Sequence, residues 1–320
     1  MLDYRVKTFL AVYRLGSFTA AARELHISQP AVSQHIRQLE AHYGCPLFST
    51  QTRMVRPTPA GELLFERLSV MANDERRIEE EIGLLAGGGM ASTAHPLRFG
   101  CTRTVADYLA PQLLASHAAH HPDQRILMTC GNTRELLEAI RAGSLDFALV
   151  EGSFDHRLFD HETFSSEPFV AVTAPMTLPA PESIRDLLAY PLVLREPGSG
   201  TREILEANLA ARDLTIDDFP HRIELASINA IKALVQAGGG VSFMYHIAVE
   251  RELADGALAD VTPADFPISH DFSLIWERGS QYADSYRALC RTWRVKARVA
   301  GRRLTQSPSG KTRDTRSFFK

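Results

Sequence analysis

The sequence lacks any hydrophobic run close to the ~20 residues that a membrane-spanning helix needs. Its four cysteines form no Cys-x-x-Cys pair and no His/Cys cluster at metal-ligand spacing, so we expect no metal. The Gly-x-Ser-x-Gly, His-Glu-x-x-His and phosphate-loop motifs are also missing, so we expect no catalytic residues and no cofactor. The first residues lead into an amphipathic pattern without a secretory hydrophobic region. These absences predict a cytoplasmic protein that is not an enzyme and has no membrane partner.

Charge is nearly balanced over the 320 residues, with a net charge of −3, but it is unevenly distributed. Residues 1–60 contain seven Lys/Arg against three Asp/Glu, and residues 291–320 contain ten against one. The middle of the chain is therefore acidic. A basic N-terminal segment on an acidic body is typical of a DNA-binding head joined to a larger domain that the phosphates repel.

Residues 17–40 contain two short helical patterns separated by a tight turn. Ser17 and Ser28 are suitable N-caps, and Pro30 suits the first turn of the second helix. This second helix, expected from Gln29 to Tyr43, has one apolar stripe and a side of amides, hydroxyls and a guanidinium. Such groups match base edges and phosphates in a DNA major groove, which predicts a helix-turn-helix. The alternative is an ordinary helical hairpin whose polar side is only solvated.

The candidate DNA contacts carry hydroxyl, amide or guanidinium groups or lie at the start of the second helix. They are Ser17, Thr19, Ser28, Gln29, Pro30, Ser33, Gln34 and Arg37. Leu47 and Phe48 then begin a short extended segment, and Arg53 to Arg56 lead back to Pro57-Thr58, which predicts a two-stranded wing. Two basic wing residues, Arg53 and Arg56, are expected to lie along the DNA backbone or in the minor groove.

A set of residues with a characteristic spacing runs through the whole first segment. These are Ser17-Phe18-Thr19, Ala21-Ala22, Leu25, Ser28 to Ser33, Ile36, Leu39-Glu40, Gly44, Pro46-Leu47-Phe48 and Thr58 to Gly61. With this set the segment resembles the LysR-type transcriptional regulators. The resemblance implies a winged helix-turn-helix in a dimer, usually assembled into tetramers. The family usually has arginine where this chain has Thr50, and Arg53 is the candidate to replace that contact.

A long helix is expected to begin at Thr58-Pro59, because no further proline occurs before Pro96. It carries a heptad seam that is interrupted only at Glu75. The candidate dimerisation residues in this seam are Leu64, Leu68, Met71, Ile78, Ile82 and Leu85. A helix ~42 Å long cannot bury such a seam against a small head alone, so we expect a partner helix. The alternative is that the seam packs on the head of its own chain.

From Leu97 onward, apolar strands alternate with polar turns that open helices, which predicts a parallel α/β sheet. Ligands bind beyond the carboxyl ends of the strands in such sheets, where hydroxyls and helix N-termini collect. The segment from Glu196 to Arg202 combines glycines with two hydroxyls and a helix start, which suits a small anion. The alternative is a plain strand-to-helix loop.

The arrangement of two α/β units joined by two crossovers resembles the periplasmic-binding-protein-like effector domain of the same family. This resemblance implies effector contacts from strand ends on both walls of the cleft between the units. The candidates are Thr102, Arg103, Thr104, Asn132, Thr133, Ser199, Gly200, Thr201 and Arg202, with Asn229 and Ser242 as weaker ones. Arginines and hydroxyls favour an anionic effector. The run from Arg195 to Arg202 is similar to regulators of sulfur assimilation and of carbon fixation.

The fold class expected is therefore a multidomain α/β protein. Its parts are a winged helix-turn-helix (1–58), a linker and dimerisation helix (59–86), a hinge (87–96), a two-lobed effector domain (97–298) and a basic, disordered tail (299–320). Lobe I comprises 97–163 and 268–298, and lobe II comprises 164–267. Two cysteines at the ends of neighbouring strands, Cys101 and Cys130, allow a redox role, but the alternative of buried, inert thiols is the more common case.

The function predicted is that of a LysR-type transcriptional regulator whose binding to promoter DNA responds to a small, anionic effector. The expected partners are double-stranded DNA, the effector and a second copy in a homodimer or homotetramer, with RNA polymerase as a further candidate. One alternative is a DNA-bending protein that needs no effector. Another is a solute-binding protein or enzyme fused to a DNA-binding head.

Overall fold

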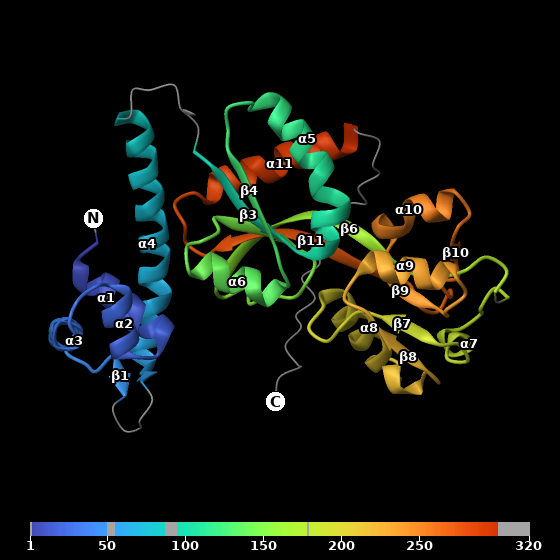
Figure 1. The fold of residues 1–320 in the computed structure, drawn as a ribbon, viewed down its shortest axis with the longest axis horizontal. Coiled ribbons are helices and arrows are strands. Elements are labelled where there is room, and N and C mark those ends of the chain that lie inside the picture. Colours follow the sequence, from blue (N-terminus) through green and yellow to red (C-terminus); the bar gives the residue numbers. More distant parts are fainter. Residues whose placement is uncertain (1, 50–54, 87–94, 178, 300–320) are drawn as a thin grey trace.

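The computed structural model describes residues 2–49, 55–86, 95–177 and 179–299. A small helical head packs around the N-terminal half of one long helix, α4 (Pro59–Ala86), and a two-lobed α/β domain extends from the other side of that helix (Figure 1). The predicted hinge and tail lie mostly outside the described residues. No helix in the described ranges is long and apolar enough to cross a membrane.

Three helices form the head, and each begins at a side-chain cap. They are α1 (Tyr4–Leu15), α2 (Phe18–Glu24) and α3 (Gln29–Tyr43). The caps are the side chains of Asp3, Ser17 and Ser28, which accept from backbone N–H groups in the first turns. Apolar residues from all three helices and from the start of α4 form one core around Phe9. The helix-turn-helix expected from the sequence is confirmed, with α3 in the place of the recognition helix.

The wing consists of two short antiparallel strands, β1 (Phe48–Ser49) and β2 (Arg56–Pro57). Phe48 packs into the head core against Phe9, with 5.4 Å between the ring centroids. The backbone of Leu47 closely faces Gly61 of α4, where an added Cβ would lie 2.1 Å from the Leu47 oxygen. A side chain at position 61 would therefore push the long helix away from the wing.

The effector domain is built on one mixed sheet of seven strands. The strands are β3 (Leu97–Cys101), β4 (Ile126–Cys130), β5 (Phe147–Val150), β6 (Phe159–Thr173), β9 (Ser242–Tyr245), β10 (Ala259–Asp260) and β11 (Ile268–Glu277). β3, β4 and β5 are parallel, as expected, but β5 pairs antiparallel with β11, and β6 pairs antiparallel with β11, β9 and β10. The parallel pairing expected for the first three strands is therefore confirmed, and the antiparallel strands β6, β9, β10 and β11 make the sheet as a whole mixed. The two long strands β6 and β11 run side by side through both lobes and form the predicted crossovers.

Helices cover the sheet in lobe I and surround a smaller sheet in lobe II (Figure 1). In lobe I they are the π-helix η1 (Val105–Leu109), α5 (Ala110–His120), α6 (Thr133–Arg141) and α11 (Ala283–Val299). In lobe II they are α7 (Ile184–Leu187), α8 (Gly200–Ala210), the 3₁₀ turn η2 (Ile216–Asp218), α9 (Ile228–Gln236) and α10 (His246–Ala254). Two further parallel strands, β7 (Leu192–Leu194) and β8 (Arg222–Glu224), complete lobe II.

Candidate DNA-binding surface and effector site

The exposed side of α3 presents polar side chains in a small network. The Gln29 amide donates to the Ser33 hydroxyl at 3.1 Å, and the Arg37 guanidinium donates to the Ser33 carbonyl at 3.2 Å. Gln34 and Pro30 are exposed beside them, while the apolar stripe of the helix is buried in the head. The bonds among these residues hold their side chains along α3 without burying them. This surface suits the edge of a DNA groove.

The remaining predicted DNA contacts surround this helix. Ser17 and Ser28 act as N-caps, so their hydroxyls already accept bonds from Ala20 and Ala31. Thr19 is exposed, as is Arg56 of the wing. Arg53 and Thr50 lie outside the described residues, and the predicted role of Arg53 stays a prediction.

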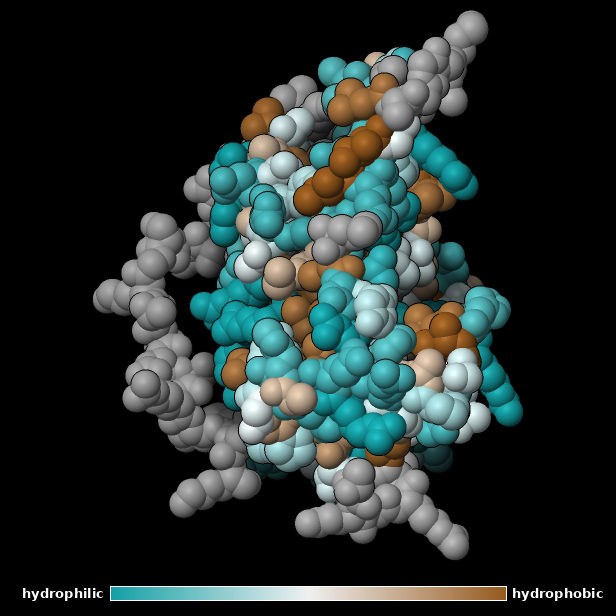
Figure 2. Space-filling model, turned by 90° about the vertical axis from the view of Figure 1, so that its left-hand side faces the viewer, coloured by the Kyte–Doolittle hydropathy of each residue, from teal (hydrophilic) through white to brown (hydrophobic). Residues whose placement is uncertain are grey.

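The seam on α4 is divided into two parts. Leu64 is half-buried and Leu68 is 8% exposed, and both pack in the core of the head. They are therefore not available to a partner helix, and the intramolecular alternative holds for these two residues. The other four, Met71, Ile78, Ile82 and Leu85, are exposed, the last at 86%. Figure 2 shows apolar residues on the upper part of this face, where the C-terminal half of α4 lies.

A cavity of about 230 Å³ lies between the two lobes, where strand ends and helix starts meet. Lobe I contributes the residues after β3, β4 and β5, and lobe II contributes the loop between β7 and α8. The lining residues are Thr102, Arg103, Gly131, Asn132, Thr133, Glu151, Arg195, Glu196, Pro197, Gly198, Ser199 and Gly200. Six of the predicted effector contacts are thus brought together around one cavity.

Glu151 and Arg195 are the charged, buried residues of this cavity that the sequence analysis did not include among the effector contacts. Glu151 follows β5 directly and is 3% exposed. Its Oε1 accepts from the hydroxyl of Thr104 at 3.1 Å and from that of Thr201, across the cleft, at 3.5 Å. Burial raises the pKa of the Glu151 carboxyl to about 7, partly offset by the Thr104 bond and by Arg195. The signal in the sequence that could have indicated Glu151 is its position directly after an apolar strand.

Two arginines supply positive charge to the cavity. The buried Arg195 makes a two-pronged pair with Glu196, at 2.7 and 2.8 Å, and this pair lowers the pKa of Glu196 against the effect of burial. Arg103 is exposed and donates to the carbonyl of Ala226 in lobe II at 3.4 Å. Arg103 therefore spans the cleft without an acidic partner among the described residues, and its charge is available to a ligand.

The two helices that begin at the cleft, α6 and α8, differ in how their N-termini are capped. Asn132 and Glu135 form a capping box at α6, so the Asn132 oxygen is occupied by the backbone. At α8 the N-cap residue Ser199 makes no side-chain cap bond, and no partner is found within the described chain for the first backbone N–H groups of this helix. Helix N-termini of this kind favour an anion.

Five of the predicted effector residues do not line the cavity. Thr104 and Thr201 are buried and bond to Glu151, and the other three make different contacts. Arg202 is paired with Glu206 at 2.7 Å and with Glu224 at 3.0 Å, on the other side of α8. Asn229 accepts from the hydroxyl of Tyr108 at 3.1 Å, and Ser242 is buried in β9. None of the three lines the cavity.

A larger cavity of about 350 Å³ lies where α1, α4 and α6 meet. Its wall mixes the cations Lys7, Arg14 and Arg76 with the anions Glu75 and Glu79. It belongs to the contact between head, long helix and lobe I, and it lacks the strand ends that place hydroxyls and amides around a ligand. We therefore assign the effector to the smaller cavity.

The two candidate redox cysteines face each other in the parallel register of β3 and β4. Cys101 is fully buried, whereas Cys130 is exposed, so the expectation of buried thiols was wrong for Cys130. Burial raises the pKa of both thiols, that of Cys101 strongly. A thiol with a raised pKa holds little of the reactive thiolate at neutral pH, which weighs against a redox role.

Two known protein families match this chain, one over its helical head and the other over its two-lobed domain. Residues 4–62 match the bacterial regulatory helix-turn-helix family, lysR type, and residues 91–294 match the LysR substrate binding domain. The chain is 31% identical to a RuBisCO operon transcriptional regulator of Allochromatium vinosum over 87% of its own length and 90% of the relative's. It is 29% identical to the HTH-type transcriptional regulator CysL of Bacillus subtilis, over 84% and 89%.

Solved structures show the same fold at low sequence identity. ArgP from Mycobacterium tuberculosis has a TM-score of 0.65 at 18% identity, covering 96% of this chain and all of that one. Full-length OxyR from Pseudomonas aeruginosa has a TM-score of 0.60 at 22% identity, covering 92% and 95%. The arrangement of head, long helix and two-lobed domain is thus shared with these proteins.

Proposed function

The chain belongs to the LysR family of bacterial transcriptional regulators, and we propose that a small anionic effector in the inter-lobe cavity controls its binding to promoter DNA. The protein is a DNA-binding regulator and not an enzyme. The observation that carries the proposal is the cavity itself, where Arg103 lacks an acidic partner in the described ranges and the N-terminus of α8 faces the space. Both features favour negative charge.

The DNA contact that we propose is made by α3 and the wing. Gln29, Ser33, Gln34 and Arg37 would read base edges and phosphates, and Arg56 would contact the backbone. Two heads are brought together by the exposed half of the seam on α4, from Met71 to Leu85, because apolar side chains of this size gain from a partner's cover. The assembly is a homodimer or a pair of such dimers.

Communication between cavity and head is proposed to run through α4. Four polar residues of this helix bond to lobe I, and they are Asn73, Asp74, Arg76 and Arg77. An effector that changes the angle between the lobes would move the strand β11, which ends at this contact, and would thereby change the spacing of the heads. DNA bending would follow from that spacing.

A thermal-shift screen of the purified protein against small anions tests the effector site. Sulfate, phosphate, simple carboxylates and phosphorylated sugars are the probes, and stabilisation should grow with the logarithm of the ligand concentration. Thr201→Ala should abolish the shift, because Thr201, in the first turn of α8, bonds to the cavity residue Glu151 and helps to hold it in place. Arg202→Ala is the matched control and should keep the shift, because Arg202 is engaged elsewhere. A shift that survives in Thr201→Ala would contradict the site.

A further inference from the structure

Three buried polar atoms around the effector cavity lack a hydrogen-bond partner among the described residues. They are Oγ1 of Thr102, Oγ1 of Thr133 and Oε2 of Glu151. All three residues line the same cavity. Because a buried polar atom without a partner is costly, a cluster of three around one cavity indicates that a polar ligand completes their bonding.

The two oxygens of Glu151 are in different situations. Oε1 accepts from the hydroxyls of Thr104 and Thr201, which fixes the orientation of the carboxyl between the lobes. Oε2 makes no well-aligned hydrogen bond within the described part of the chain, and the nearby Thr102 hydroxyl, whose oxygen is likewise without such a bond, still lowers the pKa of the carboxyl. An ionised carboxyl can only accept hydrogen bonds, so Oε2 needs a donor and repels an oxygen that carries no proton.

We propose that Glu151 selects effectors that carry an O–H or N–H donor next to their anionic group and rejects anions that have no such donor. This inference rests on the proposed function, because it requires the anion to occupy the same cavity. Arg103 and the N-terminus of α8 would hold the negative charge, and the donor of the ligand would bond to Oε2. A protonated oxyanion, a hydroxy acid or an amino acid fulfils both conditions, whereas sulfate fulfils only the first.

The surroundings of the carboxyl set its charge state. The titratable groups that interact with Glu151 belong to four different parts of the fold, and they are Arg195, Cys101, Cys130 and Tyr245. The thiols and the phenol have raised pKa values and stay neutral near pH 7, so Arg195 is the one charged neighbour in this set. Above its own pKa of about 7 the carboxyl is ionised and selective, and below it the O–H of the neutral carboxyl can donate a hydrogen bond to any anion.

Calorimetric titration with matched pairs of anions at about pH 8 tests the selection, because there the carboxyl is ionised. Hydrogenphosphate is compared with sulfate, and lactate with propionate, since the members of each pair differ little except in the donor. Leaving Oε2 without a donor costs about 1–3 kcal/mol, so we expect the partner without a donor to bind roughly tenfold to a hundredfold more weakly. At about pH 6, sulfate binding to the wild type should strengthen.

Glu151→Gln supplies the decisive variant. Its amide oxygen can replace Oε1 opposite the two threonines, and its NH₂ group then lies where Oε2 was and donates. The variant should bind sulfate and propionate as well as their donor-bearing partners do, without dependence on pH between 6 and 8. Glu203→Gln removes one negative charge from the exposed side of α8 and should keep the wild-type preference.

The outcomes separate the inference from the proposed function. Equal binding of both members of each pair, unchanged in Glu151→Gln but lost in Thr201→Ala, would overturn the selective role and leave the anion site in place. If none of the four anions bound the wild type or Glu151→Gln, the anion site and the inference would both fall. The folded state of Glu151→Gln is checked independently by its circular dichroism spectrum and its thermal melt without ligand.

Discussion

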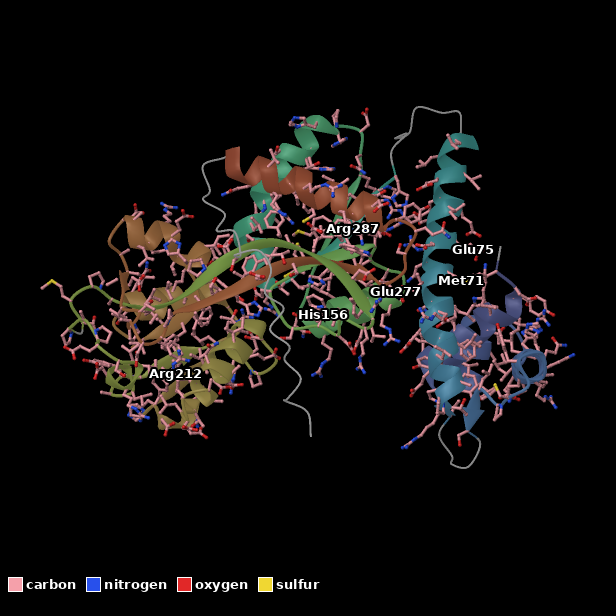
Figure 3. The ribbon with its side chains drawn as sticks, turned by 180° about the vertical axis from the view of Figure 1, so that it is seen from behind. Met71, Glu75, His156, Arg212, Glu277 and Arg287 are labelled. Carbon is pink, nitrogen blue, oxygen red and sulfur yellow. The ribbon has the colours of Figure 1, made fainter. Side chains whose placement is uncertain are left out.

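Asn73 of the long helix α4 donates a hydrogen bond of 2.7 Å to Glu277, at the end of the strand β11 that runs through both lobes. Ser69, one turn earlier, donates to the other carboxylate oxygen of Glu277, also at 2.7 Å. Glu277 lies between α4 and lobe I in Figure 3. Asp74 adds bonds to the hydroxyl of Ser280 and the backbone of Gln281. The helix that carries the head is therefore bonded to the end of a strand that runs through both lobes of the effector domain.

The contact at Glu277 should make stability depend on pH. Burial raises the pKa of Glu277 from the ordinary 4.5 to about 7, against the bonds from Ser69 and Asn73. Between these values the folded protein holds a proton that the unfolded chain has lost, so the free energy of unfolding falls as the pH rises. Glu151 contributes with the same sign.

Glu277→Gln should remove the part of this dependence that belongs to Glu277. Thermal melts at about pH 5.5 and about pH 8 should show the wild type losing stability relative to the variant at the higher pH. Glu75→Gln, a change of the same type on α4, should leave the dependence as it is. A difference between wild type and Glu277→Gln that stayed constant with pH would show that Glu277 does not titrate there.

The exposed half of the seam on α4 should determine the oligomeric state. Ile82, at 59% exposed, contacts little of its own chain, so Ile82→Glu should weaken association without unfolding the protomer. Leu63→Glu is the matched control, because Leu63 is 56% exposed on the same helix but lies off the seam. Sedimentation velocity should show smaller particles for Ile82→Glu only. Particles of unchanged size for Ile82→Glu would show that the seam does not mediate association.

Two residues of α3 should affect DNA binding in different ways. Gln34→Ala should lose roughly 1–3 kcal/mol of discrimination between the operator and unrelated DNA, because an amide reads base edges. Arg37→Ala should weaken binding to both DNAs and reduce the salt dependence by about one ion, because a guanidinium on this side contacts phosphate. Fluorescence anisotropy at several salt concentrations measures both quantities. A uniform effect of Gln34→Ala on both DNAs would contradict direct reading.

The thiols should not control DNA binding. Raised pKa values at Cys101 and Cys130 keep both groups protonated and slow to react with peroxide. The wild type and Cys130→Ser should therefore bind operator DNA equally, before and after treatment with peroxide. Loss of binding in the treated wild type, with protection in Cys130→Ser, would establish the redox role that the raised pKa values of the thiols disfavour.

Local signals in the sequence were sufficient for most of the fold. Serine caps and Pro59 begin helices where they were expected, since capping depends on neighbouring residues only. The mixed character of the sheet was not predictable in this way, because the direction of β11 against β5 is decided by its pairing with β6 over a long separation in sequence. The division of the seam between head and solvent also depends on how the head docks on α4.

Only part of the candidate site was predictable, because strand ends can be recognised in the sequence but contacts between distant residues cannot. Thr102, Asn132 and Ser199 follow strands or open helices, and the rule of strand ends places them at one cavity. Glu151 follows the third strand, β5, in the same way, so the same rule indicates this residue, although it was not among the predicted contacts. Arg202 looked equally suitable, but its side chain meets Glu224 of β8, a contact that no local pattern reveals.

The bend of operator DNA tests the proposed link between cavity and head most directly. It is measured by energy transfer between the ends of the DNA, with and without an anion that stabilises the protein. We expect the anion to change the bend angle of the DNA bound by the wild type. In Asn73→Ala, whose cavity is intact but whose bonds to Glu277 and Ile140 are lost, the anion should still bind while the bend responds less. If the anion binds the wild type tightly and leaves the bend and the footprint unchanged, the proposed link between cavity and head is contradicted.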